Sequence, residues 1–205
     1  MAHQLPLLSA PPQRLEAPGL RLRHWPAWLV HPHQWMALLQ AEVPWKQERI
    51  RLFGREHPLP RLTCGMGDPG CHYRYSGVEN PLEPWTPAVQ QLRHRLEREL
   101  GEPFNALLLN LYRHGEDHMG WHADDEPELD PGAPIASLSL GEARSFRLRP
   151  RPGGNTDAAP LSLELQSGDL LVMDPPTQRH WQHQLPPRRR RPGARINLTF
   201  RRVRR

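Results

Sequence analysis

A histidine and an aspartate near the middle of the chain have the spacing of a metal site. His122 and Asp124 stand two residues apart in the segment Gly-Trp-His-Ala-Asp-Asp-Glu, so in an extended chain both side chains leave the same face and can converge on one ion. The segment Gln-Arg-His-Trp-Gln-His offers two candidates for a third ligand, His180 and His183. Two imidazoles and one carboxylate are typical of non-haem Fe(II) oxygenases, and zinc accepts the same ligands. A His-x-Asp pair by itself also occurs often by chance.

A segment near the end of the chain places polar side chains on one face of a predicted strand. These side chains alternate with apolar residues and are Arg195, Asn197, Thr199 and Arg201. Burying two guanidinium groups is costly unless a carboxylate binds beside them. The face is therefore either a carboxylate site or a solvated sheet edge. The segment Asn110-Leu111-Tyr112 alternates in the same way shortly before His122, which favours the carboxylate site.

Short strands preceded by two helices are expected to position these residues. Residues 31–42 and 84–100 have apolar positions at helical spacing. After Gly101 the period becomes that of strands, which are predicted at 104–112, 135–140, 145–149, 161–165, 169–173 and 195–203. Because no helices alternate with these strands, the pattern predicts an antiparallel sandwich or jelly roll. The proline-rich residues 1–19 are predicted to be a poorly ordered tail or an edge segment.

Length and composition limit the classes of protein that fit. The 205 residues suit one domain, and the hydrophobic content of 37% excludes wholesale disorder. Only Cys64 and Cys71 are present, so a disulfide framework is excluded and a metal must be held by nitrogen and oxygen. No apolar run is long enough to span a membrane and the start lacks a signal-peptide pattern, which predicts a soluble intracellular protein.

The positive charge is concentrated at the end of the chain. The formal net charge is +5, and residues 188–205 contain nine arginines and no acidic residue. Such a block is either a solvated face or a tail that binds polyanions such as nucleic acid.

Several segments together resemble the AlkB family of Fe(II)- and 2-oxoglutarate-dependent dioxygenases, in order and in spacing. They are Asn110-Leu111-Tyr112, His122-Ala123-Asp124-Asp125-Glu126, Pro134-Ile135-Ala136-Ser137-Leu138-Ser139-Leu140-Gly141, His183 and Arg195-Ile196-Asn197-Leu198-Thr199-Phe200-Arg201. The resemblance spans residues 52–201 and is closest to the branch that repairs DNA in the human nucleus. It implies an α+β fold with a double-stranded β-helix (jelly-roll) core, N-terminal helices and a nucleotide-recognition lid. Residues 20–205 would form one domain after a tail at 1–19, with the lid at about 50–80 and the core at about 104–203.

The resemblance implies an iron site and a co-substrate site. The Fe(II) ligands would be His122, Asp124 and His183, because His183 stands twelve residues before Arg195 as the family's distal histidine does. The residues that would hold 2-oxoglutarate are Asn110, Tyr112, Arg195, Asn197, Thr199 and Arg201. A planar guanidinium suits the carboxylate remote from the metal. Dioxygen would be the second co-substrate.

The resemblance also implies a lid that grips a flipped base. In residues 68–77, Tyr73, Tyr75 and Ser76 match base-pocket positions, where flat side chains stack on the extruded base. Asp125 and Glu126 would accept hydrogen bonds from an alkylated base and balance its positive charge. An ordinary acidic loop is the alternative, since residues 116–130 carry seven acidic residues.

A short segment before the lid resembles a wedge that enters the duplex beside the flipped base. It consists of Leu52, Phe53 and Gly54, and an exposed Phe next to Gly at a turn has a suitable shape. Packing of Phe53 under a loop is the alternative. Where the family has a tyrosine shortly before the lid, this chain has Met66, so one substrate contact differs here.

The predicted function is oxidative dealkylation repair of 1-methyladenine and 3-methylcytosine in DNA, with release of aldehyde, succinate and CO2. The alternatives are an RNA demethylase, a protein hydroxylase or demethylase, and a catalytically silent nucleic-acid-binding jelly roll. The predicted partner is alkylated DNA, with double-stranded DNA favoured over single-stranded DNA or RNA. No membrane partner is expected, and the protein is predicted to be a monomer. The expected location is the cytoplasm at a bacterial nucleoid, or the nucleus of a eukaryote.

Overall fold

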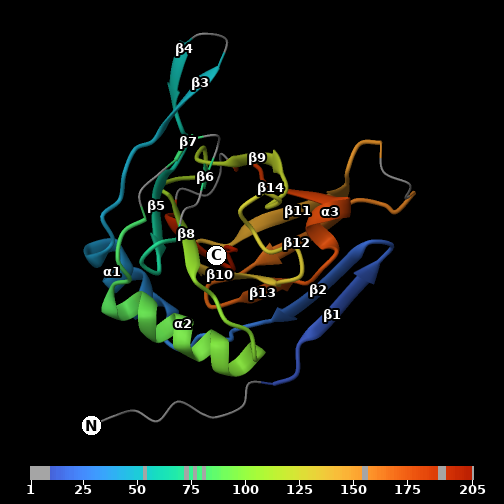
Figure 1. Cartoon of the computed structure of the whole chain (residues 1–205), viewed down its shortest axis with the longest axis horizontal. Helices are drawn as coiled ribbons and strands as arrows, with labels where there is room; N and C mark the ends of the chain where they lie inside the picture. Colours follow the sequence, from blue (N-terminus) through green and yellow to red (C-terminus); the bar gives the residue numbers. More distant parts are fainter. Residues whose placement is uncertain are drawn as a thin grey trace.

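Two antiparallel sheets packed against each other form the body of the protein in a computed structural model (Figure 1). The structure describes residues 10–52, 55–71, 74–75, 78–79, 82–153, 157–188 and 193–204, with the backbone alone at 51–52, 74–75 and 78–79. The larger sheet contains, in spatial order, β1 (Gln13–Ala17), β2 (Leu20–Trp25), β13 (Leu170–Met173), β10 (Ile135–Gly141), β15 (Arg195–Arg201), β8 (Ala106–Tyr112) and β5 (Leu62–Gly67). The smaller sheet contains β12 (Leu161–Leu165), β11 (Arg144–Pro150), β14 (Trp181–Leu185) and β9 (Met119–His122). The predicted antiparallel jelly-roll type of fold is therefore confirmed.

Two helices cover the outer face of the larger sheet. They are α1 (Pro32–Glu42) and α2 (Pro87–Leu100), and both were predicted, although α2 starts three residues later than expected. The Thr86 side chain accepts a hydrogen bond from the backbone N–H of Val89, which caps the helix at this point. Gly101 ends α2 at a φ of +69°, a left-handed conformation that glycine adopts without strain. None of the helices in the described ranges has the length and hydrophobicity that a membrane span needs.

Strand alternation separates the core from the functional face. On β15, Ile196, Leu198 and Phe200 pack in the core beneath the helices. The intervening polar residues of β15 face the space between the two sheets, where they meet Asn110 and Tyr112 of the neighbouring β8. The predicted division of this strand into an apolar and a polar face is thus confirmed.

The start of the chain contributes an edge to the larger sheet. β1 pairs with β2, and β2 pairs in turn with β13. Of the two interpretations of residues 1–19, the edge segment is what residues 13–17 form.

A hairpin and a short strand pair lie outside the two sheets. The hairpin of β3 (Arg49–Leu52) and β4 (Arg55–Pro58) extends away from the body (Figure 1), with Leu52 paired to Arg55. Phe53 and Gly54, the centre of the expected wedge, lie outside the described residues, as does the side chain of Leu52. The pair β6 (Arg74–Tyr75) and β7 (Val78–Glu79) lies in the expected lid region. Tyr73 and Ser76 lie outside the description, as does the Tyr75 side chain.

Candidate metal centre and carboxylate pocket

The two histidines of the candidate metal centre face each other across neighbouring strands of the smaller sheet. His122 ends β9 and is the register partner of His183 on β14, and their ring centroids are 4.1 Å apart. Phe146 on β11 packs beside His183, with ring centroids 5.1 Å apart. Cross-strand pairing therefore brings together two residues that are 61 positions apart in the sequence.

Asp124 completes a group of three ligands. Each residue offers one ligand atom, and these atoms all lie within 4.8 Å of one another. The Asp124 carboxylate oxygens lie 3.9 Å from Nε2 of His122 and 3.8 Å from Nε2 of His183. His122 donates from Nδ1 to the carbonyl oxygen of Gly120 at 2.9 Å, which leaves its Nε2 as an acceptor that can bind a metal.

The other candidate for the third ligand lies elsewhere. His180 is exposed at the end of the short helix α3 (Thr177–His180) and is not part of this group. Of the two histidines that the sequence offered, the structure brings His183 to the site.

The environment sets the protonation states that a metal needs. Burial and, to a smaller extent, the neighbouring His122 lower the pKa of His183 to about 3. Burial likewise lowers the pKa of His122. Burial alone would raise the pKa of Asp124, but the charge and the hydrogen bond of Arg201 hold it below its ordinary value. At neutral pH the group is thus two neutral imidazoles and one carboxylate, the forms that ligate metals.

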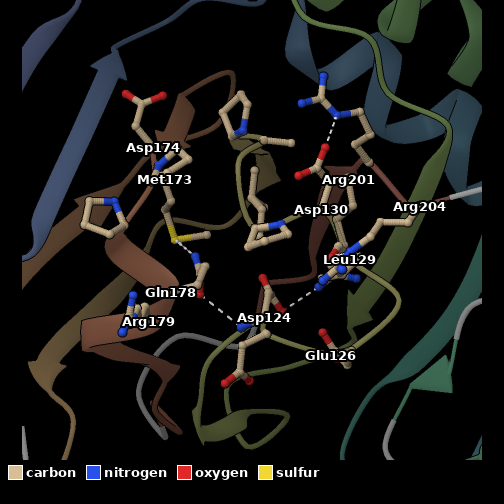
Figure 2. Close-up of a pocket in the computed structure, with 18 of the residues that line it drawn as sticks. Asp124, Glu126, Leu129, Asp130, Met173, Asp174, Gln178, Arg179, Arg201 and Arg204 are labelled. Atoms are coloured by element: carbon tan, nitrogen blue, oxygen red, sulfur yellow. Dashed lines mark hydrogen bonds and ion pairs between the residues drawn. The ribbon is translucent and has the colours of Figure 1, made fainter.

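Two side chains fix Asp124 from either side (Figure 2). Arg201 Nη2 donates to Oδ1 of Asp124 at 2.7 Å, and the side chains of Arg201 and Asp124 are almost completely buried. Gln178 Oε1 accepts a hydrogen bond from the backbone N–H of Asp124 at 2.9 Å, while Gln178 Nε2 lies 3.2 Å from Sδ of Met173. These residues line a cavity of about 370 Å³ next to the metal centre. We call His122, Asp124, His183 and Arg201 the metal end of the site.

The polar face of β15 leads from the metal end into a narrow pocket between the sheets. At the far end of this face, Arg195 is 2% exposed and donates to the Ser139 hydroxyl at 2.7 Å and to the Leu165 carbonyl at 3.3 Å. Its Nε has no hydrogen-bond partner, and no carboxylate pairs with it among the described residues. Burial lowers the pKa of Arg195 to about 10. A buried cation in this state favours the arrival of a ligand carboxylate. We call Arg195, Tyr112 and Ser139 the deep end.

A chain of hydrogen bonds orders the residues between the two ends. The Thr199 hydroxyl donates to Oδ1 of Asn197 at 2.9 Å, and Asn197 Nδ2 donates to the Ser137 hydroxyl at 2.8 Å. Asn110 Oδ1 accepts from Arg61 Nε at 2.8 Å. All six predicted co-substrate residues therefore line one pocket, which also contains the three metal-centre residues.

Several residues at the site were missed from sequence. Ser137 and Ser139 alternate with apolar residues on β10, a polar face that could have been recognised by the same rule as that of β15. Arg61 and Gln178 reach the site from a loop and from α3. Only the tertiary structure brings them there, so no pattern in the sequence indicates their roles.

The loop after the metal centre holds the two acidic residues expected to meet a base. Asp125 is exposed and forms an ion pair with Arg151 at 2.7 Å, and Glu126 is half-buried. Met66, which stands where the family has a tyrosine, is fully buried in the core beneath the helices. This position therefore contributes to packing here.

The described arginines near the end of the chain do not form one uniform charged surface. Arg195 and Arg201 are buried in the site, whereas Arg202 pairs with Glu102 and Asp130. Arg188 pairs with Glu164. Residues 189–192 and 205 lie outside the described residues.

The residues present fit an Fe(II) ion together with a dicarboxylate. The donor set is two nitrogens and one oxygen in the required protonation states. The deep end presents a buried guanidinium with an unpartnered Nε, and a carboxylate would satisfy it.

Comparison with known proteins gives a consistent result. The family described as the 2OG-Fe(II) oxygenase superfamily matches residues 22–201. The chain is 42% identical over 161 residues to DNA oxidative demethylase ALKBH2 of Mus musculus, covering 76% of this chain and 66% of the relative. It is 41% identical over 168 residues to Alpha-ketoglutarate-dependent dioxygenase alkB homolog 3 of Rattus norvegicus, covering 79% of this chain and 56% of the relative. The chain thus spans about three-fifths of the length of these curated relatives.

A solved structure supports the fold alone. OsALKBH1 superposes with a TM-score of 0.54 at 22% sequence identity, covering 92% of this chain and 100% of that chain. Together with the family match and the two relatives, the His-Asp-His group shows that this chain belongs to the 2OG-Fe(II) oxygenase superfamily and, within it, to the AlkB family.

Proposed function

We propose that this protein is an Fe(II)- and 2-oxoglutarate-dependent dioxygenase that removes N-linked alkyl groups from nucleobases in DNA. The observation that carries the proposal is one pocket that has three metal-ligand side chains at one end and a buried guanidinium without a carboxylate partner among the described residues at the other. Such a pocket suits a co-substrate that chelates a metal and has a second carboxylate remote from it.

His122, Asp124 and His183 would hold the Fe(II) ion. When bound, the ion would supply the chemistry by which dioxygen and 2-oxoglutarate oxidise an alkyl carbon. The co-products would be succinate and CO2, and the alkyl group would leave as an aldehyde. The protein's own part is positioning. The Gly120 carbonyl holds the His122 ring in the tautomer that ligates through Nε2, and Arg201 and Gln178 fix Asp124.

Arg195 would bind the remote carboxylate of 2-oxoglutarate, with Tyr112, Asn110, Asn197 and Thr199 along its path. The hydrogen bonds among Thr199, Asn197 and Ser137 keep these polar groups in place before the co-substrate arrives. Such preorganisation reduces the entropy lost on binding.

The substrate would enter on the side of the exposed edge of His122, which is a quarter exposed whereas His183 is buried. Asp125 and Glu126 follow the ligand Asp124 directly and would balance the fixed positive charge of 1-methyladenine or 3-methylcytosine. Tyr73, Tyr75 and Ser76 would grip the flipped base. Leu52, Phe53 and Gly54 would enter the duplex, a role supported by the β3–β4 hairpin that extends from the body.

The proposed unit of function is a single domain at residues 20–205, to whose larger sheet β1 (Gln13–Ala17) adds an edge strand, with a lid at about 50–80 and a jelly-roll core at about 104–203. We propose that it acts as a monomer on double-stranded DNA, at the nucleoid of a bacterium or in the nucleus of a eukaryote. The name of the Mus musculus relative, DNA oxidative demethylase, supports a nucleic-acid substrate.

The test is anaerobic loading with Fe(II) and 2-oxoglutarate, then incubation in air with DNA oligomers that each carry one 1-methyladenine. Loss of the methyl group is followed by mass spectrometry on double-stranded and single-stranded substrates. We expect loss that requires both cofactors and is faster on the duplex. The His183→Ala variant should lose it, and the matched variant His180→Ala should retain it, since His180 is exposed and outside the metal group.

The outcomes separate the alternatives. Consumption of 2-oxoglutarate without demethylation of either DNA would contradict the DNA proposal, and the same assay on matched RNA and on protein substrates would then identify the substrate class. No consumption with any substrate would indicate a catalytically silent binding module. Equal rates on duplex and single strand, unchanged in Phe53→Ala, would contradict the wedge.

A further inference from the structure

A second buried arginine lies beside the deep end. Arg144, the first residue of β11, is 1% exposed. It shares the inward face of this strand with Phe146 and Leu148, whereas Arg147 on the outward face is exposed. The smaller sheet therefore points a guanidinium toward the space between the sheets, from the wall opposite β15.

The contacts of Arg144 satisfy only part of its guanidinium. Nη2 donates to the carbonyl oxygens of Asp117 at 2.9 Å and Pro186 at 2.7 Å. Nε and Nη1 are buried and have no hydrogen-bond partner, and no carboxylate forms an ion pair with Arg144 among the described residues. Burial lowers the pKa of this group. A buried cation in this condition is costly unless an anion compensates for it.

Two observations place Arg144 at the deep end. Its Cζ lies 5.9 Å from the centre of the Tyr112 ring, and Tyr112 is the register partner of Arg195. In addition, Arg144 pairs in register with Leu165, whose carbonyl oxygen accepts a hydrogen bond from Arg195. Arg144 and Arg195 thus approach one end of the pocket from the two opposing sheets. The charge of Arg144 adds to the burial that lowers the pKa of Arg195.

We propose that Arg144 is a positioning residue for the co-substrate: it holds the ring of Tyr112 and adds a second positive charge at the deep end, so that the pocket selects a ligand with a carboxylate remote from the metal. The proposal rests on the proposed function, because it takes 2-oxoglutarate as the co-substrate. Two buried cations that share no protein carboxylate repel each other, and a ligand carboxylate relieves this repulsion for both.

A purely structural role is the competing explanation. The hydrogen bonds of Nη2 join the segment before β9 to the segment after β14, so Arg144 also connects two loops. A structural connection would affect all ligands of the pocket alike. A charge at the deep end would affect only ligands that carry the remote carboxylate.

The test measures binding of 2-oxoglutarate and of 2-oxopentanoate, which has the same carbon chain without the remote carboxylate. The full chain is loaded with Mn(II), and the affinity for 2-oxoglutarate is measured by calorimetry. The affinity for the weaker ligand, 2-oxopentanoate, is measured by calorimetric competition. The variants are Arg144→Met, Arg144→Gln and Arg144→Lys, and Arg147→Met is the matched control on the same strand. We expect Arg144→Met to weaken 2-oxoglutarate binding about tenfold or more, as for loss of one charge-assisted contact, with 2-oxopentanoate unchanged. Arg144→Lys should recover most of the loss.

Other results would overturn the proposal. Equal weakening of both ligands, or no weakening of 2-oxoglutarate, would assign Arg144 to the scaffold. If circular dichroism shows that the Arg144→Met variant is unfolded, the Arg144→Gln variant, which keeps an N–H donor, replaces it. Failure of all three Arg144 variants to fold would equally assign Arg144 to the scaffold. Absence of 2-oxoglutarate binding by the unmodified protein would instead contradict the proposed function itself.

Discussion

The metal end and the deep end of the pocket both contain a buried arginine, but their charges are balanced differently. At the metal end Arg201 lies 2.7 Å from the Asp124 carboxylate. At the deep end Arg195 meets a hydroxyl and a carbonyl, and no carboxylate among the described residues. The metal end is therefore held together by the protein alone, whereas the deep end reaches charge balance only when a ligand supplies a carboxylate.

This difference separates residues that stabilise the fold from residues that bind. Removing one partner of a buried ion pair leaves the other charge uncompensated and destabilises the protein strongly. Removing a buried cation that has no counter-ion carries no such penalty. The two arginines lie six positions apart on one strand, so variants at these positions test the contrast in nearly the same environment.

The largest effect is expected for Arg201→Met. In the metal-free protein it would leave the Asp124 carboxylate buried without its cation and lower the free energy of unfolding by about 3–5 kcal/mol. Mn(II) should restore part of this stability, because the ion replaces the lost positive charge. Urea unfolding with and without Mn(II) measures both effects. The double variant with Asp124→Asn should recover stability without metal, and a loss that persists in it would show that Asp124 is not the cause.

Arg195→Met should have the opposite profile. We expect the free energy of unfolding to change by less than about 1 kcal/mol, because no buried carboxylate is abandoned. The free energy of 2-oxoglutarate binding should become less favourable by about 2–4 kcal/mol, as for loss of one partner of a buried charge pair. Calorimetry on the Mn(II) form and urea unfolding provide the two values. A large loss of stability with intact binding would reverse our comparison of the two ends.

The metal end should also make the stability of the metal-free protein depend on pH. The pKa of His183 is about 3 in the folded protein, below its ordinary value of 6.5, and that of His122 is also lowered. The unfolded chain therefore takes up protons first as the pH falls below 6.5, so stability is present above that pH and is lost between 6.5 and about 3. Asp124, with its lowered pKa, adds a loss in the same direction below its ordinary value.

The expected size of the loss is on the order of a few kcal/mol. Urea unfolding at a series of pH values from 7 down to 4 measures it. The variant His183→Gln should flatten the dependence, and an unchanged slope in this variant would mean that other groups cause it.

The sequence predicted those parts of the site that lie on one short stretch of chain. The alternation of β15 indicated its polar face, because this pattern depends only on strand geometry. The spacing of His122 and Asp124 indicated two ligands, although β9 ends at His122 and Asp124 lies two residues beyond the strand. The choice between His180 and His183 depended on where α3 ends and β14 begins. Spacing within the chain could not decide this without the family resemblance, whereas register pairing with His122 does.

Arg144 shows how a boundary error of one residue hides a functional candidate. The predicted strand at 145–149 starts one residue after β11 does. With the observed start, Arg144 has the same parity as Phe146 and Leu148, and alternation places it on the buried face. Gln178 had no such pattern, because its partner is a backbone N–H that is 54 positions away in the sequence.

Gln178→Met tests the smallest effect, on the support of the metal end. The substitution keeps the length of the side chain but removes the oxygen that accepts from the Asp124 N–H, and a buried donor left without an acceptor costs about 1–3 kcal/mol. We expect Mn(II) affinity to fall severalfold while 2-oxoglutarate binding at saturating metal stays nearly unchanged, because the deep end does not contact Gln178. Arg179→Met, at the exposed neighbouring position on α3, is the matched control for calorimetric titration with Mn(II). Equal metal affinity in the two variants would mean that Arg201 alone suffices to orient Asp124, and the charge balance of the metal end would then depend on that single ion pair.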